Sequence, residues 1–221
     1  MNITPESMAL KIEHTILKPD ADYASVDRIV DEAIKYKFAA VCVNPCFVSR
    51  VATKLRGSSV GITTVVGFPL GATFSSVKAF EAEKAVEVGA TEIDMVINTG
   101  AVKSHDYDRV IDDIRIVRAA VPGVCLTVIL ETGLLENDEI IMCCKLAVEA
   151  GADFVKASSG FVSTGAKASH IALMRKAVGT KKGVKASGGI RNLKDAIEML
   201  EAGANRLGCS ASINIVDELS R

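Results

Sequence analysis

The sequence predicts an α/β protein of the (β/α)8 (TIM) barrel class, forming one domain over residues 1–221. Short β-branched or apolar runs alternate with amphipathic stretches along the whole chain, which is the pattern of parallel β-α-β units. A nine-residue segment also occurs in three similar copies, at 86–94, 148–156 and 200–208. Several of the units are therefore expected to be equivalent, as the units of a barrel are.

Eight runs are short and rich in β-branched or apolar residues, as buried parallel strands are. In chain order these expected strands are residues 10–17, 38–44, 62–68, 92–98, 125–131, 154–158, 184–187 and 206–209. Amphipathic segments between them predict helices, and the clearest are residues 22–36, 75–88, 106–120, 137–150, 167–178 and 192–202.

The three similar segments also predict which side chains share a layer inside the barrel. Each copy has glycine at its fourth position, which suits the left-handed residue that ends a helix, and its ninth position is Asp94, Lys156 or Gly208. These positions belong to the fourth, sixth and eighth strands, and alternate strands of a barrel contribute to one interior layer. We therefore expect Asp94 to face Lys156, and Glu92 to form a structural ion pair with Arg206 in another layer.

An open, doubly wound sheet is the alternative fold. Such a sheet usually carries a glycine-rich fingerprint after its first strand, and residues 14–19 contain no glycine. The barrel is the preferred interpretation.

Composition narrows the class of partner. The formal net charge is −1, with 26 basic and 27 acidic side chains mixed along the chain, so neither nucleic acid nor an acidic membrane surface is an expected partner. No apolar run is long enough to span a bilayer, and the first ten residues do not resemble a signal peptide. We expect a cytoplasmic protein that binds a small molecule.

The six cysteines include no C-x-x-C pair. Several lie in apolar segments, where a free cysteine packs as a small hydrophobic residue. This pattern favours a reducing compartment and predicts no metal site.

Two lysines carry the expected chemistry. Lys156 and Lys185 lie in apolar strand contexts, and an unpaired ammonium is costly to bury. A neutral lysine can attack a carbonyl to form a Schiff base, and a second cation together with desolvation lowers its pKa. Because neighbouring strands are about 4.8 Å apart, one lysine can act as nucleophile while the other holds the charge. Asp94 would relay protons or, alternatively, only form a salt bridge with the lysines.

Turns after the later strands predict a phosphate site. Barrels bind phosphate with backbone N–H groups in the loops after strands seven and eight. The candidates in these turns are Gly188, Gly189 and Ser210, and the further candidates for substrate binding are Gly160 after the sixth strand and Gly208 in the eighth. Serine and glycine at such turns could instead be ordinary helix caps.

The motifs together resemble the deoxyribose-phosphate aldolase family over essentially the whole chain. The sequence K-A-S-S-G at 156–160 is similar to the family's K-T-S-T-G, and the segments at 66–71, 92–98, 129–132 and 185–191 also match. The resemblance implies reversible cleavage of 2-deoxy-D-ribose 5-phosphate to D-glyceraldehyde 3-phosphate and acetaldehyde, without metal or organic cofactor. It implies that Lys156 forms the Schiff base, that Lys185 lowers its pKa and that Asp94 relays protons. Family members are often dimers or larger, so a homo-oligomer is expected.

Four positions depart from the family pattern. Glu13 stands where the family has aspartate, Ala157 replaces a threonine, Thr127 occupies a position that is often lysine, and Ala211 replaces a second serine of the phosphate loop. His14, in the first strand, either points into the barrel mouth or satisfies a hydrogen bond in the core, and no histidine is assigned a role.

Two other functions remain open from the sequence. One is a different Schiff-base enzyme, such as another sugar-phosphate aldolase or a transaldolase-like protein. The other is a noncatalytic barrel that binds a phosphorylated metabolite.

Overall fold

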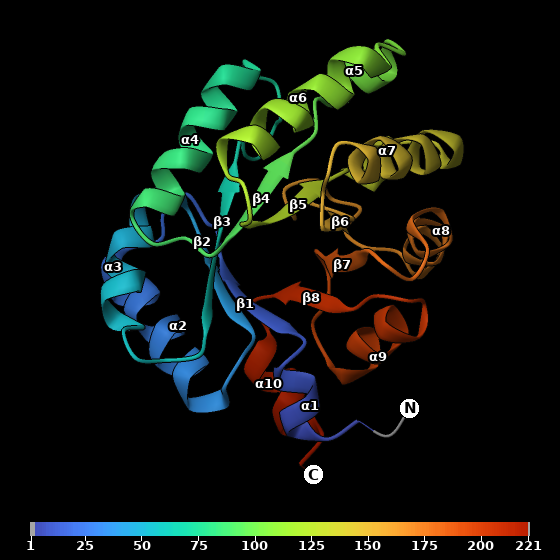
Figure 1. The fold of residues 1–221 in the computed structure, drawn as a ribbon. Coiled ribbons are helices and arrows are strands. Elements are labelled where there is room, and N and C mark those ends of the chain that lie inside the picture. Colours follow the sequence, from blue (N-terminus) through green and yellow to red (C-terminus); the bar gives the residue numbers. More distant parts are fainter. Residues whose placement is uncertain (1–2, 221) are drawn as a thin grey trace.

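The protein forms a closed barrel of eight parallel strands, as Figure 1 shows for a computed structural model that describes residues 3–220. The strands follow one another around the barrel in chain order, and β1 pairs with β8 to close it. They are β1 (Ile12–Ile16), β2 (Ala40–Val43), β3 (Gly61–Val66), β4 (Glu92–Val96), β5 (Cys125–Ile129), β6 (Phe154–Lys156), β7 (Gly183–Ser187) and β8 (Arg206–Cys209). This confirms the barrel and excludes the open, doubly wound sheet.

The six expected helices are present, with each end within one residue of the prediction. They are α2 (Tyr23–Tyr36), α4 (Ser75–Glu87), α6 (Tyr107–Ala120), α7 (Asn137–Glu149), α8 (Ala168–Val178) and α9 (Leu193–Glu201). Several first residues of the predicted ranges are N-caps with extended or otherwise non-helical backbone, such as Asp22, whose carboxylate accepts the N–H of Ser25. An N-cap lies half outside the helix by definition.

Six shorter elements were not predicted from the sequence. They are α1 (Pro5–Ala9), the 3-10 helix η1 (Pro45–Phe47), α3 (Val48–Lys54), α5 (Thr99–Lys103), η2 (Thr132–Leu134) and α10 (Ser212–Glu218). None exceeds two turns, so none is long enough to show helical periodicity. Helices α1 and α10 lie side by side at the end of the barrel where the chain starts and finishes (Figure 1).

Most of the expected strands were too long at their carboxyl ends. Strand β4, for example, ends at Val96 instead of residue 98, and β6 ends at Lys156 instead of 158. Most of the extra residues are apolar or small, with Asn44, Asn98 and Glu131 as the exceptions, and all lie in the loops that follow the strands. These loops at the carboxyl ends build the cavity described below.

The hydrophobic core lies between the barrel and its helices. Both faces of the strands are covered, so all four residues of β2 are buried. Inside the barrel the only apolar cluster among the described residues is small and lies near its mouth, formed by Leu17, Cys42, Val65 and Phe68. Most of the remaining interior carries polar and charged side chains, which burial alone does not favour.

The equivalence of the three repeated segments is visible in the backbone. Gly89, Gly151 and Gly203 all have positive φ, between 91° and 118°, immediately after a helix. The next strand begins at the same distance after each glycine, so the ninth residues of the segments lie in β4, β6 and β8.

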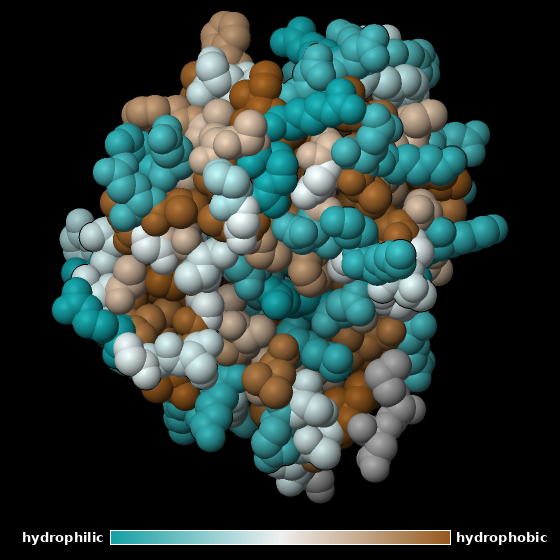
Figure 2. Space-filling model, in the orientation of Figure 1, coloured by the Kyte–Doolittle hydropathy of each residue, from teal (hydrophilic) through white to brown (hydrophobic). Residues whose placement is uncertain are grey.

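The outer surface mixes residue types. Figure 2 shows hydrophilic side chains interspersed with small hydrophobic areas on the face turned toward the viewer. Within residues 3–220, no helix has the length and apolar character required to cross a bilayer.

Candidate active site

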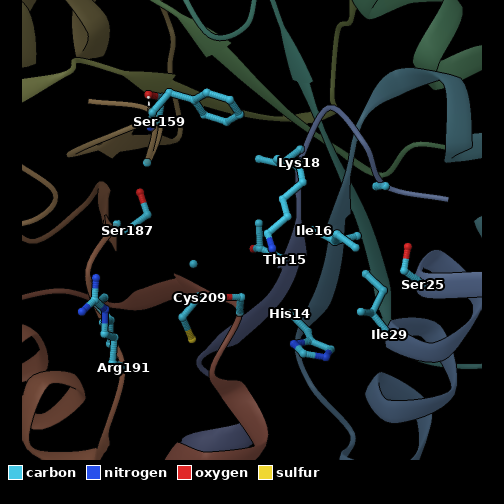
Figure 3. A pocket seen from close by; sticks show the side chains of 18 of the residues that line it. His14, Thr15, Ile16, Lys18, Ser25, Ile29, Ser159, Ser187, Arg191 and Cys209 are labelled. Atoms are coloured by element: carbon cyan, nitrogen blue, oxygen red, sulfur yellow. Dashed lines mark hydrogen bonds between the residues drawn. The ribbon is translucent and has the colours of Figure 1, made fainter. Parts of the chain in front are cut away.

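A cavity of about 1000 Å³ opens at the carboxyl ends of the strands. Its walls come mainly from β1, β6, β7, β8 and the loops that follow them, and Figure 3 shows side chains from these segments around it. Lys156 lines this cavity at the end of β6. The cavity therefore lies where barrels build their active sites.

Lys156, Asp94 and Lys185 form one buried cluster, as predicted from the repeat for Asp94 and from the adjacent strand for Lys185. The Lys156 Nζ donates to Asp94 Oδ2 over 2.8 Å, and the Lys185 Nζ donates to Asp94 Oδ1 over 2.8 Å and to Oδ2 over 3.1 Å. Strands β6 and β7 are paired with Lys156 opposite Lys185. Of these three side chains only Lys156 lines the described cavity, so Asp94 and Lys185 lie beneath it.

Glu13 is a fourth member of the cluster and was not predicted. Its carboxylate oxygens lie 2.7 and 2.8 Å from the Lys185 Nζ. Its side chain is fully buried in β1, and the only signal in the sequence was that it replaces the family's aspartate. Lys185 is therefore held between two carboxylates, those of Glu13 and Asp94.

The expected ion pair between Glu92 and Arg206 is present below this cluster. The Arg206 Nη1 donates to the two Glu92 oxygens over 2.7 and 2.6 Å, and to Glu13 Oε1 over 3.1 Å. Both residues begin their strands, so they lie toward the amino ends of β4 and β8. Glu13 thereby connects this pair to Lys185.

Burial and charge act in opposite directions on these groups. Burial opposes the charged form of Lys185, but the Asp94 and Glu13 carboxylates outweigh it and raise the pKa of Lys185. Burial would raise the pKa of Asp94, yet Lys156 and Lys185 hold it well below its usual range. Burial also raises the pKa of Glu13, against the opposing effect of Lys185 and Arg206. In the resting cluster Lys185 is thus a cation and Asp94 an anion.

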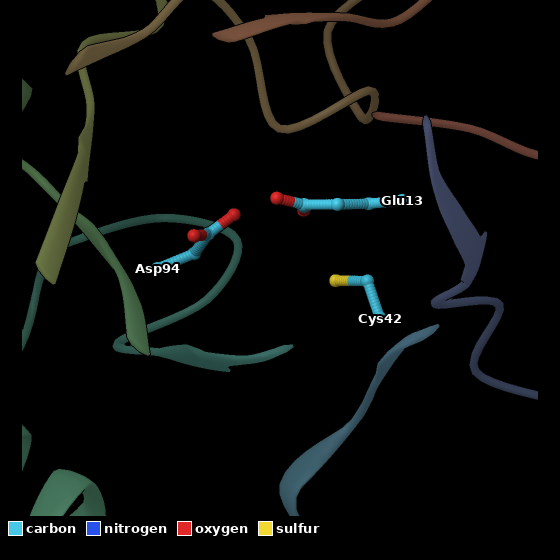
Figure 4. A group of neighbouring side chains, drawn as sticks. All are labelled: Glu13, Cys42 and Asp94. Atoms are coloured by element: carbon cyan, nitrogen blue, oxygen red, sulfur yellow. The ribbon is translucent and has the colours of Figure 1, made fainter. Parts of the chain in front are cut away.

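Glu13, Cys42 and Asp94 point toward one another inside the barrel (Figure 4). Their ligand atoms lie within 4.8 Å of one another, which is a spacing that a metal ion could use. The Lys185 ammonium, however, contacts both carboxylates and supplies the cation that they require. Burial raises the pKa of the Cys42 thiol to about 12, so it is a neutral thiol and a poor metal ligand. The donor set fits an ammonium ion better than a metal.

All five phosphate-site candidates line the same cavity as Lys156. Gly188 and Gly189 follow β7 with φ of 84° and 83°. At Gly188 a Cβ would lie 3.1 Å from Gly165 Cα and 3.2 Å from Ser158 Oγ, so this turn needs glycine both for its backbone and for its packing. Gly160 and Ser210 are exposed and line the cavity, in the loop after β6 and directly after β8 respectively.

Two buried side chains support the loop after β6 and were not singled out in the sequence. The Glu131 Oε2 accepts the N–H of Ser159 over 3.1 Å, and Ser187 Oγ donates to the carbonyl of Ser158. Glu131 itself has φ of 56°, an uncommon backbone for a residue other than glycine. These contacts fix the backbone that follows Lys156.

His14 satisfies hydrogen bonds next to the cavity wall. Its Nδ1 lies 2.9 Å from Ser212 Oγ and its Nε2 lies 2.7 Å from Glu32 Oε2. The side chain is buried against Phe38, with ring centroids 5.2 Å apart. His14 also lines the cavity, so the structure supports both interpretations that the sequence left open.

Comparison with known proteins identifies a family that matches the part of the chain containing the barrel and the lysine cluster. The model of the DeoC/LacD family of aldolases matches residues 7–216, which include the whole barrel and the lysine cluster. The chain belongs to this family. A deoxyribose-phosphate aldolase of Enterococcus faecalis is 52% identical over 206 residues, covering 93% of this chain and 94% of the relative. That of Lactococcus lactis is 52% identical over 209 residues, covering 95% of each.

Solved structures of family members are similar throughout. The tetrameric deoxyribose-phosphate aldolase of Aeropyrum pernix has a TM-score of 0.91 and 31% identity, covering 98% of this chain and 92% of that one. The aldolase QR15 has a TM-score of 0.92 and 38% identity, covering 96% of both chains. The barrel is therefore that of the aldolase family from end to end.

Proposed function

We propose that this chain is a class I deoxyribose-phosphate aldolase in which Lys156 forms the Schiff base. It cleaves 2-deoxy-D-ribose 5-phosphate reversibly to D-glyceraldehyde 3-phosphate and acetaldehyde. The observation that carries the proposal is the position of Lys156, the member of the buried lysine pair that reaches the cavity, with Asp94 at 2.8 Å. The family membership and the 52% identical aldolases support the same reaction.

The reaction begins when the neutral Lys156 Nζ attacks the substrate aldehyde carbon. Lys156 is paired with Asp94 at 2.8 Å, so the amine becomes free to attack when its extra proton passes to that carboxylate. Asp94 Oδ2 is placed to accept the proton that the Lys156 ammonium releases before the attack. After the attack one proton moves from the nitrogen to the former carbonyl oxygen, and Asp94 returns its proton to the resulting carbinolamine hydroxyl. Loss of that hydroxyl as water leaves the protonated Schiff base.

Carbon–carbon cleavage follows from the Schiff base. The iminium withdraws electrons as the substrate's 3-hydroxyl loses its proton, so the bond between C2 and C3 breaks and glyceraldehyde 3-phosphate leaves. The remaining enamine takes a proton at carbon, and water then hydrolyses the imine to acetaldehyde and free Lys156. The Asp94 and Lys185 pair supplies and receives these protons beneath the cavity floor.

The substrate phosphate would bind in the loops after β6, β7 and β8. Backbone N–H groups near Gly188, Gly189 and Ser210 are the proposed donors, with Gly160 and Gly208 allowing close approach. Ala211 leaves this site with one hydroxyl fewer than the family pattern, so backbone donors carry more of the binding.

We also propose a single functional domain, a cytoplasmic location and assembly of identical chains. All six cysteines are free thiols, as in proteins of reducing compartments. Several large apolar side chains are exposed on or near α4, including Leu70, Phe74 and Phe80, and exposed apolar area is typical of contact surfaces. The tetramer of the Aeropyrum pernix relative is consistent with association.

Borohydride reduction in the presence of acetaldehyde tests the proposal. The Schiff base should be trapped as an ethyl group on Lys156, visible by peptide mass spectrometry, with loss of activity. Lys78 is an internal control because it is also fully buried but is paired with Asp113 outside the cavity. A peptide containing Lys156 without the adduct would contradict the mechanism.

The choice of substrate needs a second measurement. Lys156→Leu should abolish retro-aldol cleavage while the circular dichroism spectrum stays unchanged. In the synthetic direction acetaldehyde should serve as donor, and turnover only with dihydroxyacetone phosphate would assign the chain to a different Schiff-base aldolase.

A further inference from the structure

The two reacting lysines belong to a set of three cations and three carboxylates inside the barrel. Each cation contacts at least one carboxylate directly, and Arg206 and Lys185 both contact the same oxygen, Glu13 Oε1. The members are Lys156, Lys185 and Arg206 with Glu13, Glu92 and Asp94. The formal charges of the set sum to zero. Replacing any charged member with a neutral side chain therefore changes the electrostatic potential at Lys156.

Arg206 is held in place from three directions. Its guanidinium donates to Glu92 and Glu13, and it also lies over the ring of Phe154, 5.3 Å from the centroid. Phe154 is two residues before Lys156 on the same strand. Arg206 is thus fixed next to the strand that carries the nucleophile, although its own side chain does not line the cavity.

Glu13 makes this arrangement continuous. Its two oxygens contact the Lys185 ammonium at 2.7 and 2.8 Å while one of them also accepts from Arg206. Glu13 therefore links the catalytic cluster above to the ion pair below, so a change of charge at Arg206 or Glu92 reaches Lys185 through one side chain.

We propose that Arg206 and Glu92 are positioning residues that set, through Glu13, the pH range over which Lys156 is available as a nucleophile. The inference rests on the proposed function of Lys156 and assigns this pair a role beyond structural support. The charged and titratable groups that face the network come from seven strands: Glu13 on β1, Cys42 on β2, Asp94 and Glu92 on β4, Cys125 on β5, Lys156 on β6, Lys185 on β7 and Arg206 on β8. Burial raises the pKa of the Cys42 and Cys125 thiols to about 12, so both stay neutral at the pH values concerned.

The sign of the effect follows from charge alone. Without the Arg206 cation the site is more negative, so Lys156 keeps its proton to higher pH. Without the Glu92 anion the site is more positive, so Lys156 loses its proton at lower pH. A purely structural ion pair would instead lose activity in both variants without a directed shift.

The experiment measures kcat/KM against pH for Arg206→Met, Glu92→Gln and the double variant, since the acid limb of kcat/KM reports the free enzyme. We expect the acid limb to move up by roughly half to one pH unit in Arg206→Met and down by a similar amount in Glu92→Gln. The double variant restores the charge balance and should lie between the two. Shifts in the same direction, or no shift in either variant, would overturn the inference.

Arg175→Met provides a matched control. Arg175 is also a partly buried arginine that donates to loop carbonyls, those of Gly203 and Lys182, and it contacts none of the six charged groups. Its loss should lower thermal stability without moving the acid limb. If Arg206→Met does not fold, Glu92→Gln alone still tests the predicted direction. A wild-type protein that forms no adduct at Lys156 would refute the proposed function instead, independently of these shifts.

Discussion

Replacing Asp94 with asparagine tests how the buried cluster is balanced. Asparagine keeps the shape of the side chain but removes the anion that accepts three hydrogen bonds from Lys156 and Lys185. Lys185 retains Glu13 as a counter-ion, so the uncompensated charge is that of Lys156. Breaking a buried pair by removing one partner costs about 3–5 kcal/mol.

The lysine can limit that cost by releasing its proton. For a lysine with an ordinary unfolded pKa of about 10.4, deprotonation at pH 7 costs about 4.6 kcal/mol. This cost is the upper limit of the destabilisation, and it falls by about 1.4 kcal/mol for each unit by which the pH rises. The destabilisation by Asp94→Asn should therefore be about 3 to 4.6 kcal/mol at pH 7 and less than about 2 kcal/mol at pH 9.

Urea denaturation followed by far-ultraviolet circular dichroism at the two pH values measures this difference. In the wild-type protein the stabilisation by Asp94 disappears at acid pH. The folded pKa of Asp94 is lowered, so its stabilisation is present above an unfolded pKa of about 3.9 and is lost as the pH falls toward the folded value. Asp27→Asn is the control, since that carboxylate pairs with Arg50 at the surface and its loss should change stability little. A loss below about 1 kcal/mol at pH 7, or the same loss at both pH values, would refute this account of the cluster.

Three further predictions concern other parts of the fold. Lys78→Met should destabilise the protein by about 3–5 kcal/mol, because it leaves the buried Asp113 carboxylate without its partner at 2.5 Å, and pairing it with Asp113→Leu should recover part of the loss in a denaturation experiment. Gly71→Ala should cost more than about 3 kcal/mol, because its φ is 67° and the new Cβ would lie 2.0 Å from a backbone oxygen; an unchanged melting temperature would contradict this. Iodoacetamide at pH 8 should label the exposed Cys46 and leave Cys42 unmodified, because burial raises the pKa of the Cys42 thiol to about 12, and mass spectrometry would detect the opposite result.

The parts of the fold that could be predicted from the sequence are those whose residues follow a periodic hydrophobic pattern. Long amphipathic helices and buried strands show this pattern over several turns or alternations. The repeated segment predicts that Asp94 faces Lys156. Elements such as α3 and α10 are too short to show a pattern, and the strand ends could not be separated from apolar loop residues. A strand ends where its backbone groups no longer form hydrogen bonds with the adjacent strand.

Glu13 shows why part of the site was missed. In the sequence it is one carboxylate in a short strand, and the two cations it contacts are 172 and 193 residues away. Spacing along the chain could place Asp94 and Lys156 in one layer because both belong to the same repeat. Glu13 lies outside the repeated segments, so only the closed barrel reveals its contacts.

The pairing of β1 with β8 has a consequence for how the protein is made. Glu13 is synthesised 172 residues before Lys185 and 193 residues before Arg206. Until then the earlier strands carry Glu13, Glu92 and Asp94 with only one of the three cations that balance them, Lys156 on β6. A truncated chain that ends before β7 would therefore carry an excess of buried negative charge, so the last strands complete the electrostatics of the catalytic centre as well as its walls.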